Sequence, residues 1–144
     1  MVEMIIVATL LLILAGVTLP FARYSIRRGK EAELALALRT MRNAIDEYKR
    51  YSDAGLIPLE LGAEGYPKEL EDLTQPIDLV GQVDRQVRFM RRIPIDPMTG
   101  SDETWILLSV GDEPESNFWG GENVFDVRSG SEGVGLNGIP YRKW

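Results

Sequence analysis

The sequence predicts an α+β protein, in which one long N-terminal helix is followed by a small domain built on an antiparallel β-sheet. Residues 4–22 are uncharged and mostly apolar, and a helical spacing of apolar residues continues beyond them. Short strand-like segments separated by turn residues fill the last third of the chain. A long helix followed by a group of strands is typical of the α+β class. We therefore divide the 144 residues into a helix over residues 1–52, with its hydrophobic half at 1–22, and a globular domain over residues 53–144.

The absence of cysteine and histidine excludes several kinds of chemistry at once. The chain can form no disulfide, no zinc site of the Cys/His kind, no haem or iron–sulfur site and no Ser–His or Cys–His nucleophile pair. A site for a hard cation stays open, because the chain has 22 Asp and Glu residues whose oxygens suit such ions.

The charges are unevenly distributed along the chain. Residues 1–92 carry 13 basic and 13 acidic residues, whereas residues 93–144 carry 9 acidic and 3 basic ones. The whole net charge of -6 therefore belongs to the last third. Because phosphate binding needs a basic face, this distribution argues against a nucleic-acid partner.

The apolar segment at residues 4–22 is expected to be a membrane-grade helix. As a helix it is about 28 Å long, close to the hydrocarbon thickness of a bilayer. It is apolar on every side, which excludes an amphipathic surface helix. A cleaved signal peptide fits poorly, because such a peptide has its basic residues before the apolar run. Here the acidic Glu3 precedes the run, and the basic residues follow it at Arg23, Arg27, Arg28 and Lys30.

The orientation of this helix has two interpretations. The positive-inside rule places the basic end, and the domain after it, in the cytoplasm. Glu3, Gly16 and Pro20 favour a different role, because a charge at the edge of an apolar helix is costly and usually functional. Pro20 lacks an N–H group and clashes with the carbonyl of Gly16, so the two residues create a local weak point. A simple anchor needs neither feature, although glycine and proline are common in membrane helices.

A helical pattern continues after Pro20 with one apolar stripe. The stripe has 4-3-4-3 spacing and consists of Leu34, Leu38, Met41, Ile45 and Tyr48. Residues 53–55, Asp-Ala-Gly, are a plausible stop. The complete helix is then about 75 Å long, with a second half that buries one face against the domain.

The first part of the domain is irregular. Residues 56–65 resemble a loop, and Tyr66 to Leu73 resembles a short helix with Pro67 in its first turn. Leu70 and Leu73 would be its apolar face. Residues 77–90 fit a short helix about as well as a loop.

The last part of the domain is expected to contain the sheet. Residues 96–100, Asp-Pro-Met-Thr-Gly, have the composition of a turn. Strands are predicted at residues 105–109 and 123–129, and a glycine-rich loop at 130–138. Tyr141 and Trp144 follow this loop and are expected to pack back onto the sheet.

The N-terminal residues resemble a known family. Val2-Glu3-Met4-Ile5-Ile6-Val7, an aliphatic run and then Leu19-Pro20 are similar to the mature N-terminus of type IV pilins and of type II secretion pseudopilins. The resemblance implies a lollipop-shaped subunit that is stored in the bacterial inner membrane, cut by a prepilin peptidase, N-methylated and assembled by platform proteins into a helical filament. Family members have a little more chain before this glutamate, so we expect that the leader lies outside this sequence or that its start is assigned late.

The domain resembles the major pseudopilins of the general-secretion G type. Tyr66-Pro67 and, in the last third, Asp96-Pro97, Phe125-Asp126-Val127-Arg128-Ser129-Gly130 and a final tryptophan follow in the family's order. In that family a calcium ion holds the C-terminal loop. By resemblance Asp126 and Ser129 are calcium ligands, with the carbonyl of Leu108 as another. For the ligand from the loop between the strands we expect Asp112, with Asn117 as the second choice.

The resemblance implies a structural function. Glu3 would pair with the amino terminus of an adjacent subunit, and residues 16–20 would lose helical structure as subunits pack. The removed leader, rather than the basic residues after the helix, would then set the orientation. We expect the major pseudopilin of a type II secretion system, a homo-oligomeric periplasmic piston; the alternatives are a surface type IV pilus for adhesion or motility and a monomeric membrane-anchored binding protein.

No enzymatic activity is expected. Asp96 with Asp102 or Glu103 could form a pair of carboxylates for acid–base work. No phosphate-binding or nucleophile motif accompanies them, and acidic residues in turns are common.

Overall fold

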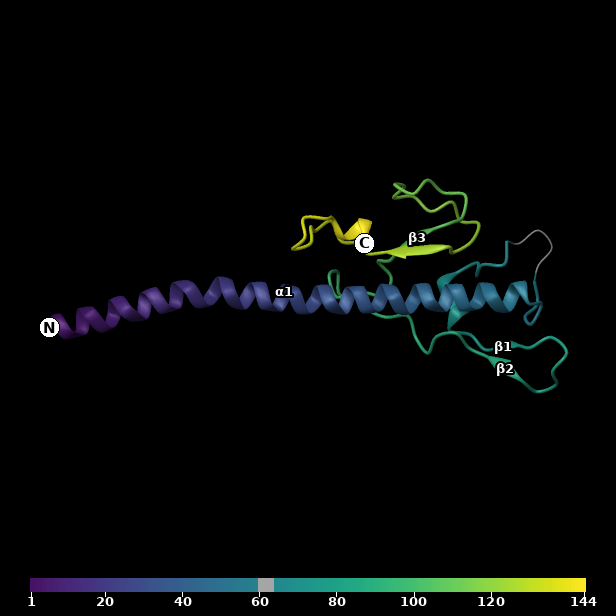
Figure 1. Ribbon diagram of the computed structural model, residues 1–144, viewed down its shortest axis with the longest axis horizontal. Coiled ribbons are helices and arrows are strands. Elements are labelled where there is room, and N and C mark those ends of the chain that lie inside the picture. The colour runs from purple at the N-terminus through teal and green to yellow at the C-terminus, as the bar shows by residue number, and fades with distance from the viewer. Residues whose placement is uncertain (60–63) are drawn as a thin grey trace.

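A computed structural model describes residues 1–59 and 64–144, and for residues 17–20 it describes only the course of the helix. One helix, α1 (Val2–Asp53), extends far beyond a small domain that lies along its C-terminal half (Figure 1). The described part of the domain contains four short strands and two 3₁₀ helices: η1 (Leu70–Leu73), β1 (Ile77–Asp78), β2 (Gln86–Val87), β3 (Ile106–Leu108), β4 (Asp126–Arg128) and η2 (Tyr141–Lys143). The predicted α+β class is confirmed at the level of a long helix followed by small antiparallel sheets.

The predicted extent and the predicted apolar stripe of the helix are both confirmed. The stripe residues Leu34, Leu38, Met41 and Ile45 are buried, at 3% exposure or less, and the fifth, Tyr48, is partly buried against the same core. The helix ends at the expected place, because Gly55 adopts a positive φ of 65° that turns the chain away. The amide of Leu56 then donates to the carbonyl of Tyr51, which satisfies one of the last helical carbonyls.

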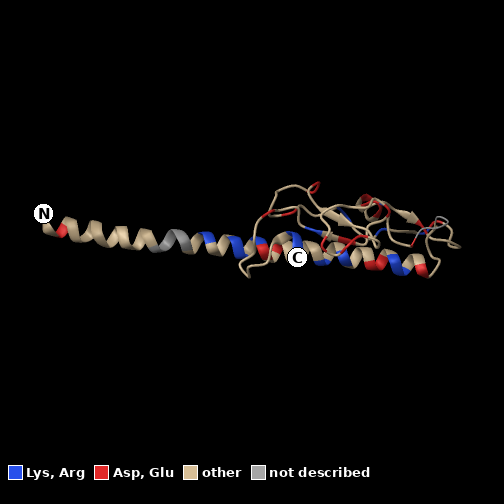
Figure 2. Ribbon diagram, turned by 90° about the horizontal axis from the view of Figure 1, so that it is seen from above, with Lys and Arg blue, Asp and Glu red and all other residues tan. Residues whose placement is uncertain are grey.

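The domain covers one side of α1 and leaves the other side open (Figure 2). Its core is made by the stripe of α1 and by buried side chains from η1, from the chain after β2, from the β3–β4 ribbon and the segments beside it, and from η2. These are Leu70, Leu73, Met90, Trp105, Val124, Val127 and Tyr141. Burial of these apolar groups is the main force that holds the domain on the helix.

The short helix predicted before residue 73 is smaller than expected. Only Leu70–Leu73 is helical, as one 3₁₀ turn, and Pro67 precedes this turn instead of lying in it. The carbonyl of Pro67 accepts from the amide of Val124, which holds this part of the chain in the core. A capping box between Glu69 and Asp72 begins the turn.

For residues 77–90 the sequence fitted a short helix and a loop equally well. The structure has neither of these but a β-hairpin. Ile77 pairs with Val87 and Asp78 with Gln86 in an antiparallel ribbon. Gly81 and Asp84 have positive φ values of 75° and 58° in the connection, and such a conformation is incompatible with a continuous helix.

The single small sheet expected from the sequence is in fact two separate ribbons. β3 and β4 lie inside the two predicted strand segments but are only three residues long. They pair with Leu108 opposite Asp126 and Ile106 opposite Arg128. The hairpin β1–β2 lies on the other flank of α1 (Figure 1).

Candidate functional site

The hydrophobic half of α1 is uncovered. Large apolar side chains from Met4 to Leu14 are roughly half to three-quarters exposed, for example 75% at Met4 and 74% at Leu12. Figure 2 shows that, between its first turn and the basic residues near position 23, the described part of this helix carries no charged residue. By length and composition, α1 is the one described helix that could cross a membrane.

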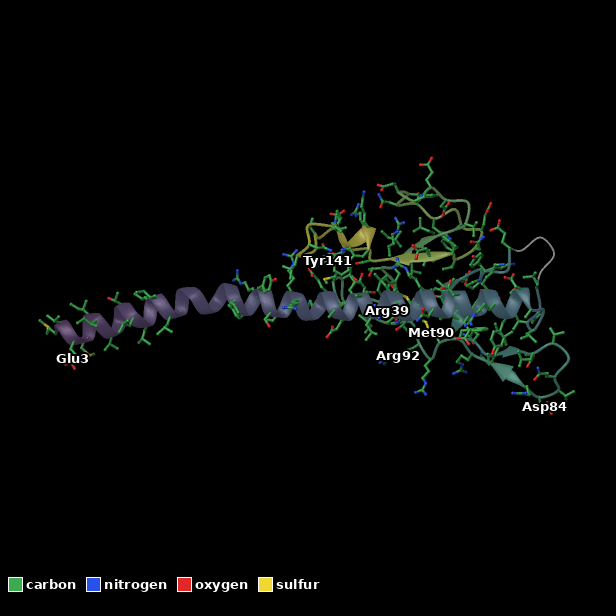
Figure 3. The ribbon with its side chains drawn as sticks, in the orientation of Figure 1. Glu3, Arg39, Asp84, Met90, Arg92 and Tyr141 are labelled. Atoms are coloured by element: carbon green, nitrogen blue, oxygen red, sulfur yellow. The ribbon has the colours of Figure 1, made fainter. Side chains whose placement is uncertain are left out.

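The three residues predicted to act in assembly all lie on this uncovered segment. Glu3 is in the first turn of α1 and is exposed; Figure 3 shows it at the far end from the domain. A side chain at Gly16 would meet no atom within 4 Å, so this position offers a bare stretch of backbone. Pro20 lies within the helix, but its side chain is outside the described residues.

The C-terminal end of the domain is fastened to α1 by a polar cluster, which we call the neck clasp: Arg27, Glu31 and Tyr141. The Tyr141 hydroxyl donates to Glu31 Oε1 at 2.8 Å and accepts from Arg27 Nε at 3.2 Å. The same Glu31 oxygen accepts from the amide of Leu136 at 2.8 Å, and Arg27 also donates to the carbonyl of Val134. The clasp therefore attaches the glycine-rich C-terminal loop to the helix.

A second attachment, the arginine staple, lies four turns further along α1. Arg42 Nε donates to Asp126 Oδ1 at 2.6 Å. Its Nη2 donates to the carbonyl of Val127 at 3.0 Å and to that of Trp144 at 2.8 Å. One guanidinium thereby ties together the helix, β4 and residue 144, which uses the fork geometry specific to arginine.

Asp96 is a buried carboxylate that organises the turn before β3. It has no exposed surface, accepts from Ser129 Oγ at 2.6 Å and accepts from the amide of Met98 at 2.8 Å. Gly130 comes directly after Ser129. A Cβ atom at this position would lie 2.1 Å from the carbonyl oxygen of Thr104, so a side chain does not fit there. Asp96 is therefore committed to structure here, and the described residues show it in no pair with Asp102 or Glu103.

Asp112 fixes the loop between β3 and β4. Its Oδ2 accepts from the amides of Ser109 at 2.7 Å and Gly120 at 3.0 Å. These two hydrogen bonds hold the pKa of the Asp112 carboxyl below its ordinary value, because they favour the charged form. The loop is closed on itself by this side chain.

The four residues expected to bind calcium do not converge on one point. Leu108 and Asp126 are opposite one another across the ribbon, and Asp112 follows the same end of β3. Ser129 follows the other end of β4, with its hydroxyl on Asp96. The second choice for the loop ligand, Asn117, is exposed in the same loop as Asp112.

Each expected ligand also has another partner. Asp126 pairs with Arg42, and its Oδ2 lies 3.8 Å from Nε of Arg128. The Leu108 carbonyl accepts a hydrogen bond from the amide of Phe125 at 2.7 Å. Among residues 1–59 and 64–144, no group of three or more acidic side chains is placed to hold a metal ion. Calcium binding stays a prediction, and calorimetric titration of the whole chain tests it; no heat of binding at millimolar calcium would contradict it.

Several of these attachments were not anticipated from the sequence. Arg27 and Glu31 stand four apart on the helix, which suggests a pair, but nothing in the sequence links them to Tyr141. The partner of Arg42 is 84 positions away, so only the folded chain brings the two together. The spacing of Asp96 and Ser129 likewise carries no local signal.

Comparison with known proteins adds nothing to this geometry. No protein-family model, curated protein or solved structure matches the chain. The function is therefore argued from the sequence pattern and from the contacts described above.

Proposed function

We propose that this chain is the structural subunit of a helical filament, and specifically the major pseudopilin of a type II secretion system. The observation that carries the proposal is the contrast within α1. One half packs a domain, while the other exposes a continuous apolar surface to which no part of the described chain is applied. Such a surface needs a cover, which a bilayer supplies before assembly and neighbouring helices supply in the filament.

Glu3 and Gly16 give this surface the features of an assembly element. A carboxylate among apolar helices is strongly unfavourable unless it is paired, and the amino terminus of the next subunit is the natural partner for Glu3. Gly16 lets a neighbouring helix approach closely, as small residues do in membrane helix packing. A lone membrane anchor requires neither feature.

The proposed location and partners follow from this role. The subunit would wait in the bacterial inner membrane, be processed by a prepilin peptidase and be extracted by platform proteins. The acidic domain would then lie on the outside of a periplasmic filament. A surface pilus has the same subunit architecture, and the length and position of the filaments distinguish the two.

The decisive experiment replaces Glu3 in cells that contain the assembly machinery. Glu3→Ala should abolish filaments in electron micrographs and leave the protein in the membrane fraction, because only the intersubunit pair is lost. Glu33→Ala is the matched control, since Glu33 is exposed on the same helix and has no ion pair among the described residues. Filaments of normal yield from Glu3→Ala would contradict the proposed pairing of Glu3, whereas a wild-type chain that forms no filaments would favour a monomeric anchor.

A further inference from the structure

A groove lined by arginines lies beside α1, on the flank away from the loop between β3 and β4. Its volume is about 780 Å³, and its walls include Arg88, Arg91 and Arg92 together with Thr40 of α1. Figure 3 shows Arg92 on the flank of α1 opposite the β3–β4 ribbon. Ile93, Pro94 and Ile95 add an apolar floor, and Ile95 is 62% exposed.

Within the described part of the chain, the three arginines have no acidic partner in ion-pair range. All three are exposed. Asp102 is the one acidic residue among the described residues that line the groove. Three guanidinium groups around one concave site repel one another, and a ligand with carboxylates relieves that repulsion through charge-assisted hydrogen bonds.

The position of the groove excludes a membrane as its partner. Thr40 lies 18 residues beyond Ala22, the last residue of the uncharged segment. Along a helix this separation is about 27 Å, which is beyond the headgroup layer of a bilayer spanned by the hydrophobic half. The net charge of -6 also opposes a nucleic acid.

The loop between β3 and β4 has the complementary chemistry. This loop, residues 109–125, carries four acidic residues and no basic one. Glu113 and Glu122 are exposed and form no ion pair among the described residues, and Phe118 between them is 81% exposed. Phe118 is presented outward by a turn, in which its amide donates to Ser116 Oγ at 3.0 Å.

We propose that the arginine groove of one subunit receives the acidic loop, residues 111–122, of a second copy of this chain. The proposal rests on the filament function proposed above and names one of its intersubunit contacts. The Phe118 ring packs on Pro94 and Ile95, and the carboxylates of the loop pair with the arginine rim. Exposed aromatic residues and arginines are the usual anchors of such contacts.

The placement of the two surfaces makes the contact open-ended. Arg92 of the groove lies on one flank of α1 (Figure 3) and the loop between β3 and β4 on the other (Figure 1). A subunit that inserts its loop into one neighbour therefore keeps its own groove free for another. A contact between two different surfaces of the same chain builds a ring or a helical filament and does not stop at a dimer.

Cysteine cross-linking tests this contact, because the natural chain has no cysteine that could interfere. Filaments of Ile95→Cys/Phe118→Cys should give, on oxidation, a ladder of disulfide-linked multimers longer than two subunits. Val83→Cys/Phe118→Cys is the matched control, since Val83 is 89% exposed but lies outside the groove, in the β1–β2 connection. This control should give no ladder.

Charge exchange gives a second readout. Arg91→Glu/Arg92→Glu in the Ile95→Cys/Phe118→Cys background should abolish the ladder, and adding Glu113→Arg/Glu122→Arg should restore it. Restoration also shows that the charge-reversed chain folds. If the wild-type chain forms filaments but the Ile95→Cys/Phe118→Cys variant gives no ladder, the proposed contact is overturned. The proposed filament function then stands.

Two other outcomes also count against the contact. A chain that forms no filaments at all would overturn the proposed function and the contact with it. A ladder that survives charge reversal, together with uptake of inorganic phosphate by the groove, would overturn the proposed pairing of the loop carboxylates with the arginines and assign the arginines to a small anion instead.

Discussion

The two halves of α1 share one continuous backbone but have opposite surroundings. Residues 4–14 expose apolar side chains on every side, whereas the half from residue 34 buries one stripe and leaves the other faces polar. In the half with the stripe, the periodic spacing of apolar residues gives the helix one face to bury, and the domain of the same chain covers that face. The uniform half has no preferred face, so its cover must surround it and must come from outside the chain.

This difference also separates two kinds of stability. The contacts of the second half decide whether the domain stays folded on the helix. Those proposed for the first half decide whether subunits stay together. Substitutions in one half should therefore leave the property of the other half largely unchanged.

The largest expected effect comes from a pair of truncations, one in each half. Met41→Ala removes a side chain with no exposed surface, so the domain should lose about 2–5 kcal/mol of unfolding free energy. Leu12→Ala should leave domain stability unchanged, because Leu12 is 74% exposed. Denaturant unfolding in mild detergent, followed by tryptophan fluorescence, measures both. Equal losses from the two variants would break the proposed division.

A smaller effect is expected at the arginine staple. Arg42→Ala removes the pair with Asp126 and two hydrogen bonds to carbonyls, and should lower the unfolding free energy by about 1–3 kcal/mol. Arg39→Ala is the control on the same helix, because Arg39 is exposed and has no ion pair among the described residues. A change at Arg39 as large as that at Arg42 would mean that helix propensity or packing, rather than the staple, is responsible.

The smallest effect concerns the acidic loop and its dependence on pH. The pKa of Asp112 is lowered in the folded chain, so its hydrogen bonds stabilise the loop fully above the unfolded value, about 3.9. That stabilisation is lost as the pH falls through the lower, folded value. The amide resonances of Ser109 and Gly120 should therefore shift below about pH 4.

Two substitutions sharpen this pH test. Asp112→Asn should remove the shift, while Glu113→Gln should not, because Glu113 is exposed and forms no hydrogen bond through its side chain to these amides. Persistence of the shift in Asp112→Asn would assign it to another carboxylate.

The helix was predictable from local pattern, and the small domain was predictable only in part. The 4-3-4-3 stripe and the glycine after Asp53 carry the information for the helix within a few residues of each other. The hairpin at residues 77–87 was not predicted, because two-residue strands leave almost no alternation to detect. Its turn depends on a positive φ at Asp84, which sequence pattern does not reveal.

The candidate site divides in the same way. Glu3, Gly16 and Pro20 stand out against an apolar background, so they could be selected from the sequence. The staple between Arg42 and Asp126 and the bond between Asp96 and Ser129 join distant positions. Acidic residues in the last third suggested a cation site, but in the fold Asp126 pairs with an arginine of the helix.

The attachment of the domain along the side of α1 has a mechanical consequence. The neck clasp, the apolar stripe and the arginine staple are spread along the helix between Arg27 and Ile45, and the staple lies beside the stripe. A load parallel to the helix axis strains all of these contacts in shear at the same time, so they resist it jointly. A load across the axis peels them one after another from the end. In the proposed filament, the subunit should therefore be stiff along the direction in which the filament grows and weakest to forces from the side.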